Sequence, residues 1–237
     1  DRDDKPLPMI VRKSDGAYLY ATTDLAAVRY RLDELKADRI IYITDARQSQ
    51  HFAMLFAAVK RAGWAGDEIK LNHMPFGTVL GANRKPFKTR DGGTIKLIDL
   101  IDEAEVRTLA VINEKNPELT ENQRKEIAQK ISIAALKYAD LSNDRIKDYV
   151  FDWDRMLALD GNTAPYLQNA YVRILSIFRK GDIDRTTLDN SSLKIEEAAE
   201  KALALKLFQY ASAVDAVTER LEPHRLCTFL YELASCF

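Results

Sequence analysis

The chain has 237 residues, of which 46% are hydrophobic and 30% are charged, and its formal net charge is −1. This composition is typical of a globular protein with more than one core, and it excludes binding of nucleic acid through an overall basic excess. The two cysteines, Cys227 and Cys236, lack metal-ligand spacing, and no apolar run approaches the roughly 18 residues of a membrane span. We therefore expect a cytoplasmic protein with reduced thiols, no structural metal and no membrane contact.

The first part of the chain alternates strand and helix signals, which predicts a parallel α/β sheet. An Asp-Gly pair at residues 15–16 predicts a β-hairpin, and Thr22, Thr23 or Asp24 can cap the helix that follows. The expected elements are the hairpin 9–12 and 17–20, a helix to about residue 35, a strand 39–44, a helix 49–62 and a strand 68–72. Short connections of this kind place ligands beyond the carboxyl ends of the strands.

From about residue 98 the strand signals stop, and helical periods continue along the rest of the chain. The expected helices are residues 98–114, 120–140, 164–179 and 193–237, the last with a break at Pro223. Residues 181–192 are polar and turn-rich, which indicates a loop between helices. The fold class expected is therefore α/β, with an all-α part after the sheet.

A loop with four glycines and four cations occupies residues 77–93. Lysine on such a loop supplies a mobile positive charge for the oxygens of a polyphosphate in its transition state, and Lys85 and Lys88 are the natural carriers. A Lys-x-x-Lys pattern is more often a solvated hairpin tip, so the loop alone is a weak signal.

Three polar residues are expected at one rim of the sheet. Tyr20 and Asp24 stand where a strand ends and a helix begins, and Gln48 follows the next strand. A carboxylate beside a phenol suits a guanidinium, because the guanidinium fork pairs bidentately with carboxylate oxygens. The alternative makes Asp24 a helix cap, Tyr20 a half-buried residue and Gln48 a surface amide. His51 is three positions after Gln48, where it can face a nucleotide or be a structural histidine.

Residues 160–173 carry the candidate RNA contacts. Asn162 or Thr163 can cap a helix that proline begins, and the same helix presents Tyr166, Gln168 and Arg173. Aromatic rings and a guanidinium can stack on splayed RNA bases, each stack contributing about 1–3 kcal/mol. Tyrosines at helical spacing are as typical of a helical core, so both interpretations of Tyr166 stay open.

Five ordered segments together resemble the arginyl-tRNA synthetases, specifically the bacterial kind. They are residues 18–24, 45–52, 85–90, 136–141 and 161–168. The resemblance covers nearly the whole chain and weakens only over residues 182–201. Because the order and spacing of all five match, the set is far more specific than any single motif.

The resemblance implies class I aminoacyl-tRNA synthetase chemistry. Arginine attacks the α-phosphate of ATP, which enters with Mg²⁺, and the arginyl group then passes from the adenylate to the 2′-hydroxyl of the terminal adenosine of tRNA(Arg). Lys85 and Lys88 correspond to the lysines of a divergent Lys-Met-Ser-Lys-Ser signature and are the implied catalytic residues.

The resemblance also implies binding roles for the other candidates. Tyr20 and Asp24 look like the residues that hold the arginine guanidinium, Gln48 like one near the amino-acid end, and His51 like an ATP-binding residue beside Lys85 and Lys88. The implied tRNA-binding residues are Asn162, Tyr166, Gln168 and Arg173.

Two departures from the family pattern matter. No His-x-Gly-His sequence occurs, because the only histidines are His51, His73 and His224. We therefore expect a fragment that lacks the N-terminal part and the C-terminal end of the family, and that is inactive by itself. Asn169 stands where the family usually shows tyrosine, which weakens the expectation of one stacking contact with tRNA.

The expected organisation has three parts. Residues 1–105 form the C-terminal half of a class I Rossmann-like catalytic domain with the lysine loop, residues 106–155 a helical connector that contacts the tRNA stem, and residues 156–237 part of an α-helical anticodon-binding bundle. The expected partners are tRNA(Arg), L-arginine and ATP, without DNA, and the intact protein is expected to be a monomer. A related nucleotidyltransferase and a tRNA-binding module without catalysis remain the alternatives.

Overall fold

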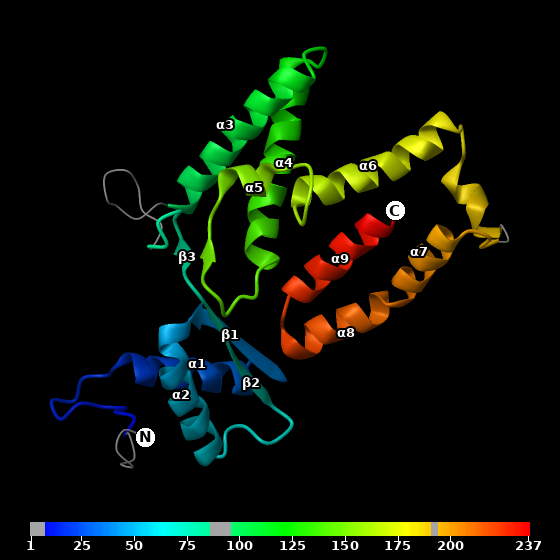
Figure 1. The fold of residues 1–237 in the computed structure, drawn as a ribbon. Helices are drawn as coiled ribbons and strands as arrows, with labels where there is room; N and C mark the ends of the chain where they lie inside the picture. Colours follow the sequence, from blue (N-terminus) through cyan, green and yellow to red (C-terminus); the bar gives the residue numbers. More distant parts are fainter. Residues whose placement is uncertain (1–7, 86–95, 191–193) are drawn as a thin grey trace. The chain divides into compact units, whose positions relative to one another are not determined.

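The structure is a computed structural model that describes residues 8–85, 96–190 and 194–237 (Figure 1). The chain divides into two compact units, residues 1–77 and 78–237. Parallel strands with helices make up the first unit, and helices dominate the second, so the expected α/β class with a following helical part is confirmed. Lys88 belongs to residues 86–95, which lie outside the described part of the chain.

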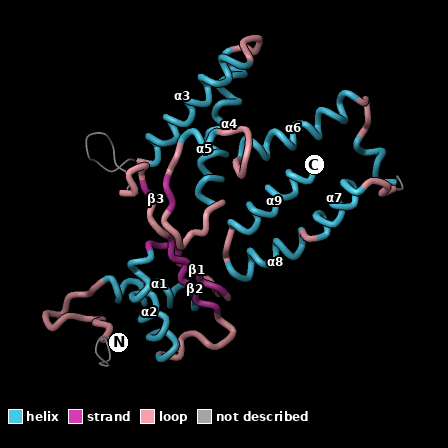
Figure 2. The backbone as a smooth tube through the Cα atoms, viewed as in Figure 1, coloured by secondary structure: helices cyan, strands magenta, loops and turns pink. Residues whose placement is uncertain are grey.

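In the first unit two parallel strands lie side by side and pack against two helices (Figure 2). Ile40 pairs with Leu71 and Ile43 with Met74 in the parallel register. The elements are α1 (Tyr20–Asp33), β1 (Arg39–Asp45), the 3₁₀ turn η1 (Ala46–Gln48), α2 (Ser49–Arg61) and β2 (Lys70–Phe76). The predicted connection of two parallel strands through a helix is therefore confirmed.

The core of this unit lies between one face of the sheet and the two helices. Val28 on α1 and Leu55 and Val59 on α2 are fully buried, at the three- and four-residue spacings that place side chains on one helix face. On the other face of the sheet, Ile41 is 41% and Ile43 is 69% exposed. Within the first unit, the two helices cover one face of this sheet.

The start of the first unit differs from the prediction. The expected hairpin is reduced to a single antiparallel bridge between Arg12 and Tyr18. The helix begins at Tyr20, before the predicted caps, because extended Leu19 is its N-cap and the Leu19 backbone N–H donates to Thr22 Oγ1 at 3.4 Å. Tyr20 and Asp24 consequently belong to one helix rather than to a strand and the helix after it.

The second strand of the sheet also differs. The predicted strand 68–72 is wrong in its bounds, since β2 extends through Pro75 to Phe76. Proline has no backbone N–H to donate, which is tolerated at a sheet edge, and β2 pairs only with β1 in the part of the chain that the structure describes.

The second unit begins with two short strands and a helical hairpin. The strands β3 (Val79–Leu80) and β4 (Tyr149–Val150) pair in parallel, and they were not predicted because two residues are too few for an alternation pattern. The hairpin consists of α3 (Leu97–Lys115) and α4 (Glu121–Leu141). Thr120 and Gln123 form a capping box at the start of α4, with Gln123 N–H donating to Thr120 Oγ1 at 3.3 Å.

Small buried residues allow the two helices of the hairpin to approach closely. Ala104 and Thr108 on α3 are buried four residues apart, and Ala128, Ser132 and Ala135 form the buried face of α4. The contacts between α3 and α4 extend along the hairpin that Figure 1 shows.

Six elements complete the second unit: α5 (Trp153–Leu157), α6 (Ala164–Lys180), the 3₁₀ segment η2 (Arg185–Asn190), α7 (Ala198–Phe208), α8 (Tyr210–Arg220) and α9 (His224–Cys236). The predicted break at Pro223 is confirmed, since this residue is the N-cap of α9. A further break at Gln209 divides the preceding stretch into α7 and α8. Within the described ranges, no helix combines the length and apolarity that a membrane crossing requires.

We expect Leu55→Ala to lower the free energy of unfolding of the first unit by about 2–5 kcal/mol, because it leaves a cavity beneath α2. Leu55 is 0% exposed, whereas Leu35 in the same unit is 60% exposed. Leu35→Ala is therefore the matched control, with an expected change within about 0.5 kcal/mol. Urea unfolding followed by circular dichroism measures both, and equal losses would contradict the proposed core.

Candidate functional site

Four predicted site residues lie at the N-terminal ends of α1 and α2. Tyr20 is the first residue of α1 and Asp24 is one turn later, while Gln48 is the N-cap of α2 and His51 is in its first turn. Residues three or four apart share a helix face, so Tyr20 lies on the same face as Asp24, and Gln48 on the same face as His51. The two helix ends that carry these four residues belong to one unit.

A short contact joins the two helix ends. His51 Nε2 lies 2.6 Å from Asp24 Oδ2, and the two side chains are 32% and 35% exposed. The pairing was not predicted, because spacing alone does not show which residues meet across a sheet edge. The other carboxylate oxygen, Asp24 Oδ1, accepts no hydrogen bond from the described residues and is available to a ligand.

Tyr20 and Gln48, on the same two helix ends, are exposed side chains. Tyr20 is 88% exposed, and neither side chain has a hydrogen-bond partner within residues 8–85. A carboxylate, a phenol hydroxyl and an amide are groups that can accept hydrogen bonds from a guanidinium.

A second carboxylate at the end of β1 already binds a guanidinium of the chain itself. Asp45 Oδ1 accepts from Arg47 Nε, and Asp45 Oδ2 from Arg47 Nη2, both at 2.8 Å. These hydrogen bonds, together with one from the Arg47 backbone, lower the pKa of Asp45 to about 2. Because Asp45 is occupied, Asp24 is the carboxylate left at this rim for a positively charged ligand.

Aromatic rings support the contact from the core side. The Phe52 ring lies edge-on to His51 at 5.2 Å and is stacked on His73 at 4.7 Å, and His73 Nε2 is 2.8 Å from Thr44 Oγ1. Burial lowers the pKa of His73, which favours its neutral form. His73 is partly buried and packs on the Phe52 ring of the core.

Tyr42 is also held neutral beside the rim. Burial raises the pKa of Tyr42; the positive charge of Arg31 opposes this shift, and the negative charge of Asp24 adds to it. Arg31 Nη1 donates to the Tyr42 hydroxyl at 2.7 Å. Tyr42 was missed from the sequence because a tyrosine in a strand gives no signal of the charges around it.

The lysine loop starts with a tight turn after β3. The backbone N–H of Gly81 donates to the Lys85 carbonyl at 2.8 Å, and the Lys85 N–H donates to Asn83 Oδ1 at 3.0 Å. Lys85 is exposed, as a mobile charge requires. Since Lys88 is outside the described residues and Lys85 belongs to the second unit, the meeting of Asp24, Gln48 and Lys88 at one cleft stays a prediction.

The turn before α6 confirms the predicted cap. Thr163 is buried, its Oγ1 accepts the Tyr166 N–H at 3.2 Å, and the same hydroxyl donates to the Ala158 carbonyl at 2.7 Å. Asn162 is exposed, and its Oδ1 accepts from the Tyr138 hydroxyl at 2.6 Å. The Tyr138 hydroxyl also lies within donating distance of the Cys227 carbonyl, at 2.9 Å.

The other candidate RNA contacts have neighbours inside the second unit. The Tyr166 ring lies 5.6 Å from the Tyr231 ring, and the Arg173 guanidinium lies 5.8 Å from the Phe237 ring. Gln168 Oε1 is buried and has no hydrogen-bond partner among the described residues. Of the four candidates, Asn162 and Arg173 are exposed, and Tyr166 and Gln168 are partly buried.

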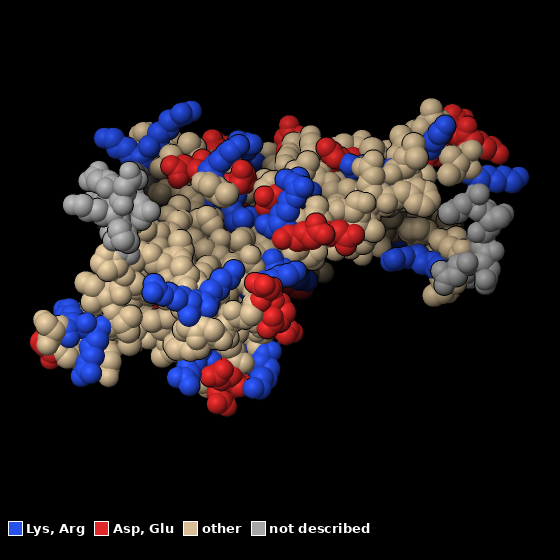
Figure 3. Space-filling view, turned by 90° about the horizontal axis from the view of Figure 1, so that it is seen from below, with Lys and Arg blue, Asp and Glu red and all other residues tan. Residues whose placement is uncertain are grey.

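The face of the described residues that Figure 3 shows has no broad patch of one charge. On the face drawn in Figure 3, Lys and Arg alternate with Asp and Glu in small groups, which agrees with the formal net charge of −1. Within the described residues, no group of three or more His, Cys, Asp or Glu side chains is arranged to hold a metal ion.

Two family models match this chain. The model described as tRNA synthetases class I (R), catalytic domain, matches residues 1–153, and the DALR anticodon binding domain matches residues 167–237. The chain belongs to the class I arginyl-tRNA synthetase family. The family assignment agrees with the five motifs in the sequence, and the catalytic match includes the rim of Asp24 and the lysine loop.

Relatives in the arginyl-tRNA synthetase family match over the full chain. The arginine–tRNA ligases of Chromobacterium violaceum and Laribacter hongkongensis are both 52% identical over 237 residues, which is 100% of this chain and 41% of each relative. The chain thus spans less than half the length of these relatives.

Solved structures of arginyl-tRNA synthetases share the fold. The enzyme from Plasmodium falciparum superposes with a TM-score of 0.86 at 31% identity, over 99% of this chain and 40% of that one. The enzyme from Thermus thermophilus superposes with a TM-score of 0.81 at 24% identity, over 96% of this chain and 42% of that one. This match shows likeness of fold alone.

We expect Tyr138→Phe to destabilise the second unit by about 1 kcal/mol, because the Asn162 side chain and the Cys227 carbonyl lose their common donor. Tyr149→Phe is the matched control, since the Tyr149 hydroxyl makes only a 3.5 Å contact with Asp140. Denaturant midpoints of the two variants give the comparison. A larger loss for Tyr149→Phe would contradict the role given to Tyr138.

Proposed function

We propose that this chain acts in arginine–tRNA ligation, with the first unit holding L-arginine, the lysine loop acting on ATP, and the second unit binding tRNA(Arg). The observation that carries the proposal is the half-exposed Asp24 carboxylate, held by His51 at the end of β1, in a chain of the arginyl-tRNA synthetase family. The alternatives of a nucleotidyltransferase and a non-catalytic RNA-binding module have no feature of comparable specificity in their favour.

Asp24 is proposed to select arginine by its side chain. With Oδ2 beside His51, Oδ1 can accept from the planar fork of a guanidinium, while the Tyr20 hydroxyl and the Gln48 amide are free to contact the rest of the amino acid. Lysine offers only a point charge on a flexible stem, so it would leave acceptors of the rim unpaired. The arrangement therefore favours arginine over the other cationic amino acid.

The proposed reaction uses positive charge at the polyphosphate. The carboxylate of arginine attacks the α-phosphate of ATP, the bond to the β-phosphate breaks, and pyrophosphate leaves with Mg²⁺ as the ion of the nucleotide. Lys85 and Lys88 would neutralise the charge that builds on the phosphate oxygens, and His51 would lie on the nucleotide side of the rim. The 2′-hydroxyl of the terminal adenosine of tRNA then takes the arginyl group, and AMP leaves.

The second unit is proposed to contact tRNA at the start of α6. Exposed Asn162 and Arg173 offer polar contacts, and the partly exposed ring of Tyr166 offers a surface for base stacking. Gln168 Oε1 is buried, so Gln168 would meet RNA through the part of its side chain that stays exposed. The match of residues 167–237 to an anticodon-binding domain supports this assignment.

Pyrophosphate exchange tests the function as a whole. Full-length relatives contain more than twice the residues of this chain, and the chain has no His-x-Gly-His sequence. We therefore expect exchange near background for the 237 residues alone and robust exchange for the protein at the length of its relatives. Binding of tRNA with neither arginine nor ATP binding at full length would favour the non-catalytic module.

We expect Asp24→Asn to weaken arginine binding about 100-fold, because the amide carries no negative charge to pair with the guanidinium at the position of Oδ1. Asp33→Asn is the control, since Asp33 lies on the same helix and forms an exposed ion pair with Arg29 at 3.2 Å. The KM for arginine and for ATP in pyrophosphate exchange by the full-length protein provides the measurement. A rise in KM for ATP alone would argue against a guanidinium site.

We expect Lys88→Ala to remove about 2–4 kcal/mol of transition-state stabilisation from adenylate formation, which lowers kcat/KM. The affinity for arginine should change little. The control is Lys115→Ala, which removes an exposed lysine at the end of α3. Single-turnover adenylate formation distinguishes the two variants. If the Lys88 variant forms adenylate at the normal rate, the role of the lysine loop is wrong.

A further inference from the structure

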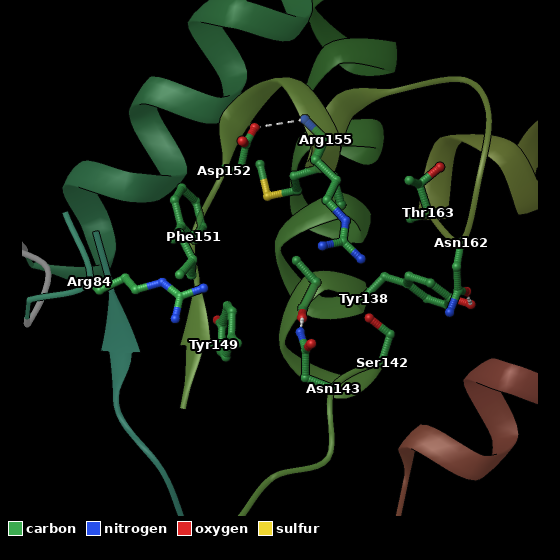
Figure 4. Close-up of a pocket in the computed structure, with 15 residues that line it drawn as sticks. Arg84, Tyr138, Ser142, Asn143, Tyr149, Phe151, Asp152, Arg155, Asn162 and Thr163 are labelled. Atoms are coloured by element: carbon green, nitrogen blue, oxygen red, sulfur yellow. Dashed lines mark hydrogen bonds between the residues drawn. The ribbon is translucent and has the colours of Figure 1, made fainter. Parts of the chain in front are cut away.

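A cavity of about 390 Å³ lies within the second unit, between α4, β4, α5 and the turn that begins α6 (Figure 4). Its volume is in the range of small-ligand sites. The charged residues that line it are Arg84, Asp152 and Arg155, and the other lining groups are neutral. The proposed catalytic steps do not use this cavity.

The two arginines carry charge that the described residues do not neutralise. Neither the Arg84 nor the Arg155 guanidinium forms an ion pair or a side-chain hydrogen bond within the described ranges, whereas other cations of this unit, such as Arg107, Lys125 and Lys130, have ion-pair partners. Figure 4 shows both guanidinium groups directed toward the space enclosed by β4 and α4. Two uncompensated cations at one hollow favour an anionic occupant.

The one carboxylate in the lining already has a structural role. Asp152 is the N-cap of α5, where its Oδ1 accepts the backbone N–H of Arg155 at 2.9 Å. This hydrogen bond turns the carboxylate toward the helix end, and Figure 4 marks it with a dashed line. Asp152 therefore fixes the start of the helix that carries Arg155 and leaves the net charge of the lining positive.

The phenols of the lining stay neutral in the presence of an anion. Burial, with the nearby negative charge of Asp140, raises the pKa of Tyr149 to about 12, and burial also raises the pKa of Tyr138. Ser142 and Asn162 add neutral polar groups, and Phe151 supplies an apolar wall. A phosphate attached to an organic group fits such a lining better than a small inorganic ion does, because both its charge and its apolar part find partners.

We propose that this cavity binds a phosphodiester group of a bound RNA strand, with Arg84 and Arg155 as its ligands. The guanidinium fork matches two phosphate oxygens, and two such groups can hold one phosphodiester from both sides. Both arginines are exposed, so a polymer strand can reach them. A free nucleotide does not need binding residues that are exposed at the surface, so the exposure favours a strand.

The place of the cavity in the fold favours RNA as the source of the phosphate. Asn162, Thr163 and Ala164 belong to its lining and also begin the helix with the candidate RNA contacts. The inference rests on the proposed function, because that function supplies the RNA. The lysine loop takes part as well, since Arg84 directly precedes Lys85 in the turn after β3.

Phosphate-ethylation interference with tRNA(Arg) tests the proposal in the full-length protein. For the wild type we expect at least one position at which ethylation of the phosphate excludes the RNA from the complex. In the double variant Arg84→Gln and Arg155→Gln, interference at that position is expected to disappear while other positions keep it. The affinity should fall about tenfold, and the slope of log K against log salt should decrease by about one.

The control is Arg220→Gln, which removes an exposed arginine from the end of α8, outside the cavity. This variant should keep every interference position of the wild type. Arg84→Lys with Arg155→Lys keeps the charge and loses the fork, so partial recovery of interference is expected from it. Thermal unfolding of each variant shows whether it is folded. If the glutamine double variant does not fold, the lysine double variant is compared with the wild type in its place.

Three outcomes would overturn the proposal. Identical interference patterns for the wild type and the double variant would remove the cavity from RNA binding and leave the proposed function intact. A raised KM for ATP with an unchanged pattern would assign the cavity to the nucleotide. Failure of the wild-type protein to bind tRNA at all would reject the proposed function together with this inference.

Discussion

The contact between Asp24 and His51 is the constraint on which the candidate arginine site depends. It joins the first turns of α1 and α2 at the carboxyl end of β1, and it leaves one carboxylate oxygen available. The neighbouring carboxylate, Asp45, is occupied by Arg47, so the rim presents a single accessible anion rather than two. A single anion with neutral polar neighbours suits a ligand with one delocalised positive charge.

A comparable junction orders the second unit. One phenol, Tyr138, lies within hydrogen-bond distance of the Asn162 side chain and the Cys227 carbonyl, and so links α4 to the turn before α6 and to α9. Tyr138 and Asn162 also line the cavity beside Arg155. The position of the candidate RNA contacts on α6 therefore depends on a side chain of the helical hairpin, which belongs to the match with the catalytic family model.

The sequence predicts the class of the fold and most helices, because their apolar periods are long and their caps are explicit, as at Thr163. Prediction from the sequence fails where a pattern spans too few residues, or where a structure depends on contacts between residues distant in sequence. The paired strands at Val79 and Tyr149 have two residues each, and the start of α1 at Tyr20 depends on a hydrogen bond from Leu19. The site residues were expected from their places in the predicted elements together with a family resemblance, whereas the Asp24–His51 contact and the role of Tyr138 required coordinates, since partners distant in sequence leave no pattern.

The open face of the parallel sheet has a practical consequence. Ile41 and Ile43 point away from the helices and stay exposed in the described residues, next to a β2 strand that pairs on one side only. Apolar side chains beside unpaired backbone groups are the surface on which protein chains aggregate. A preparation of these 237 residues should therefore need low protein concentration or mild detergent to avoid aggregation. The substitution Ile43→Lys would place a charge on this face and reduce aggregation.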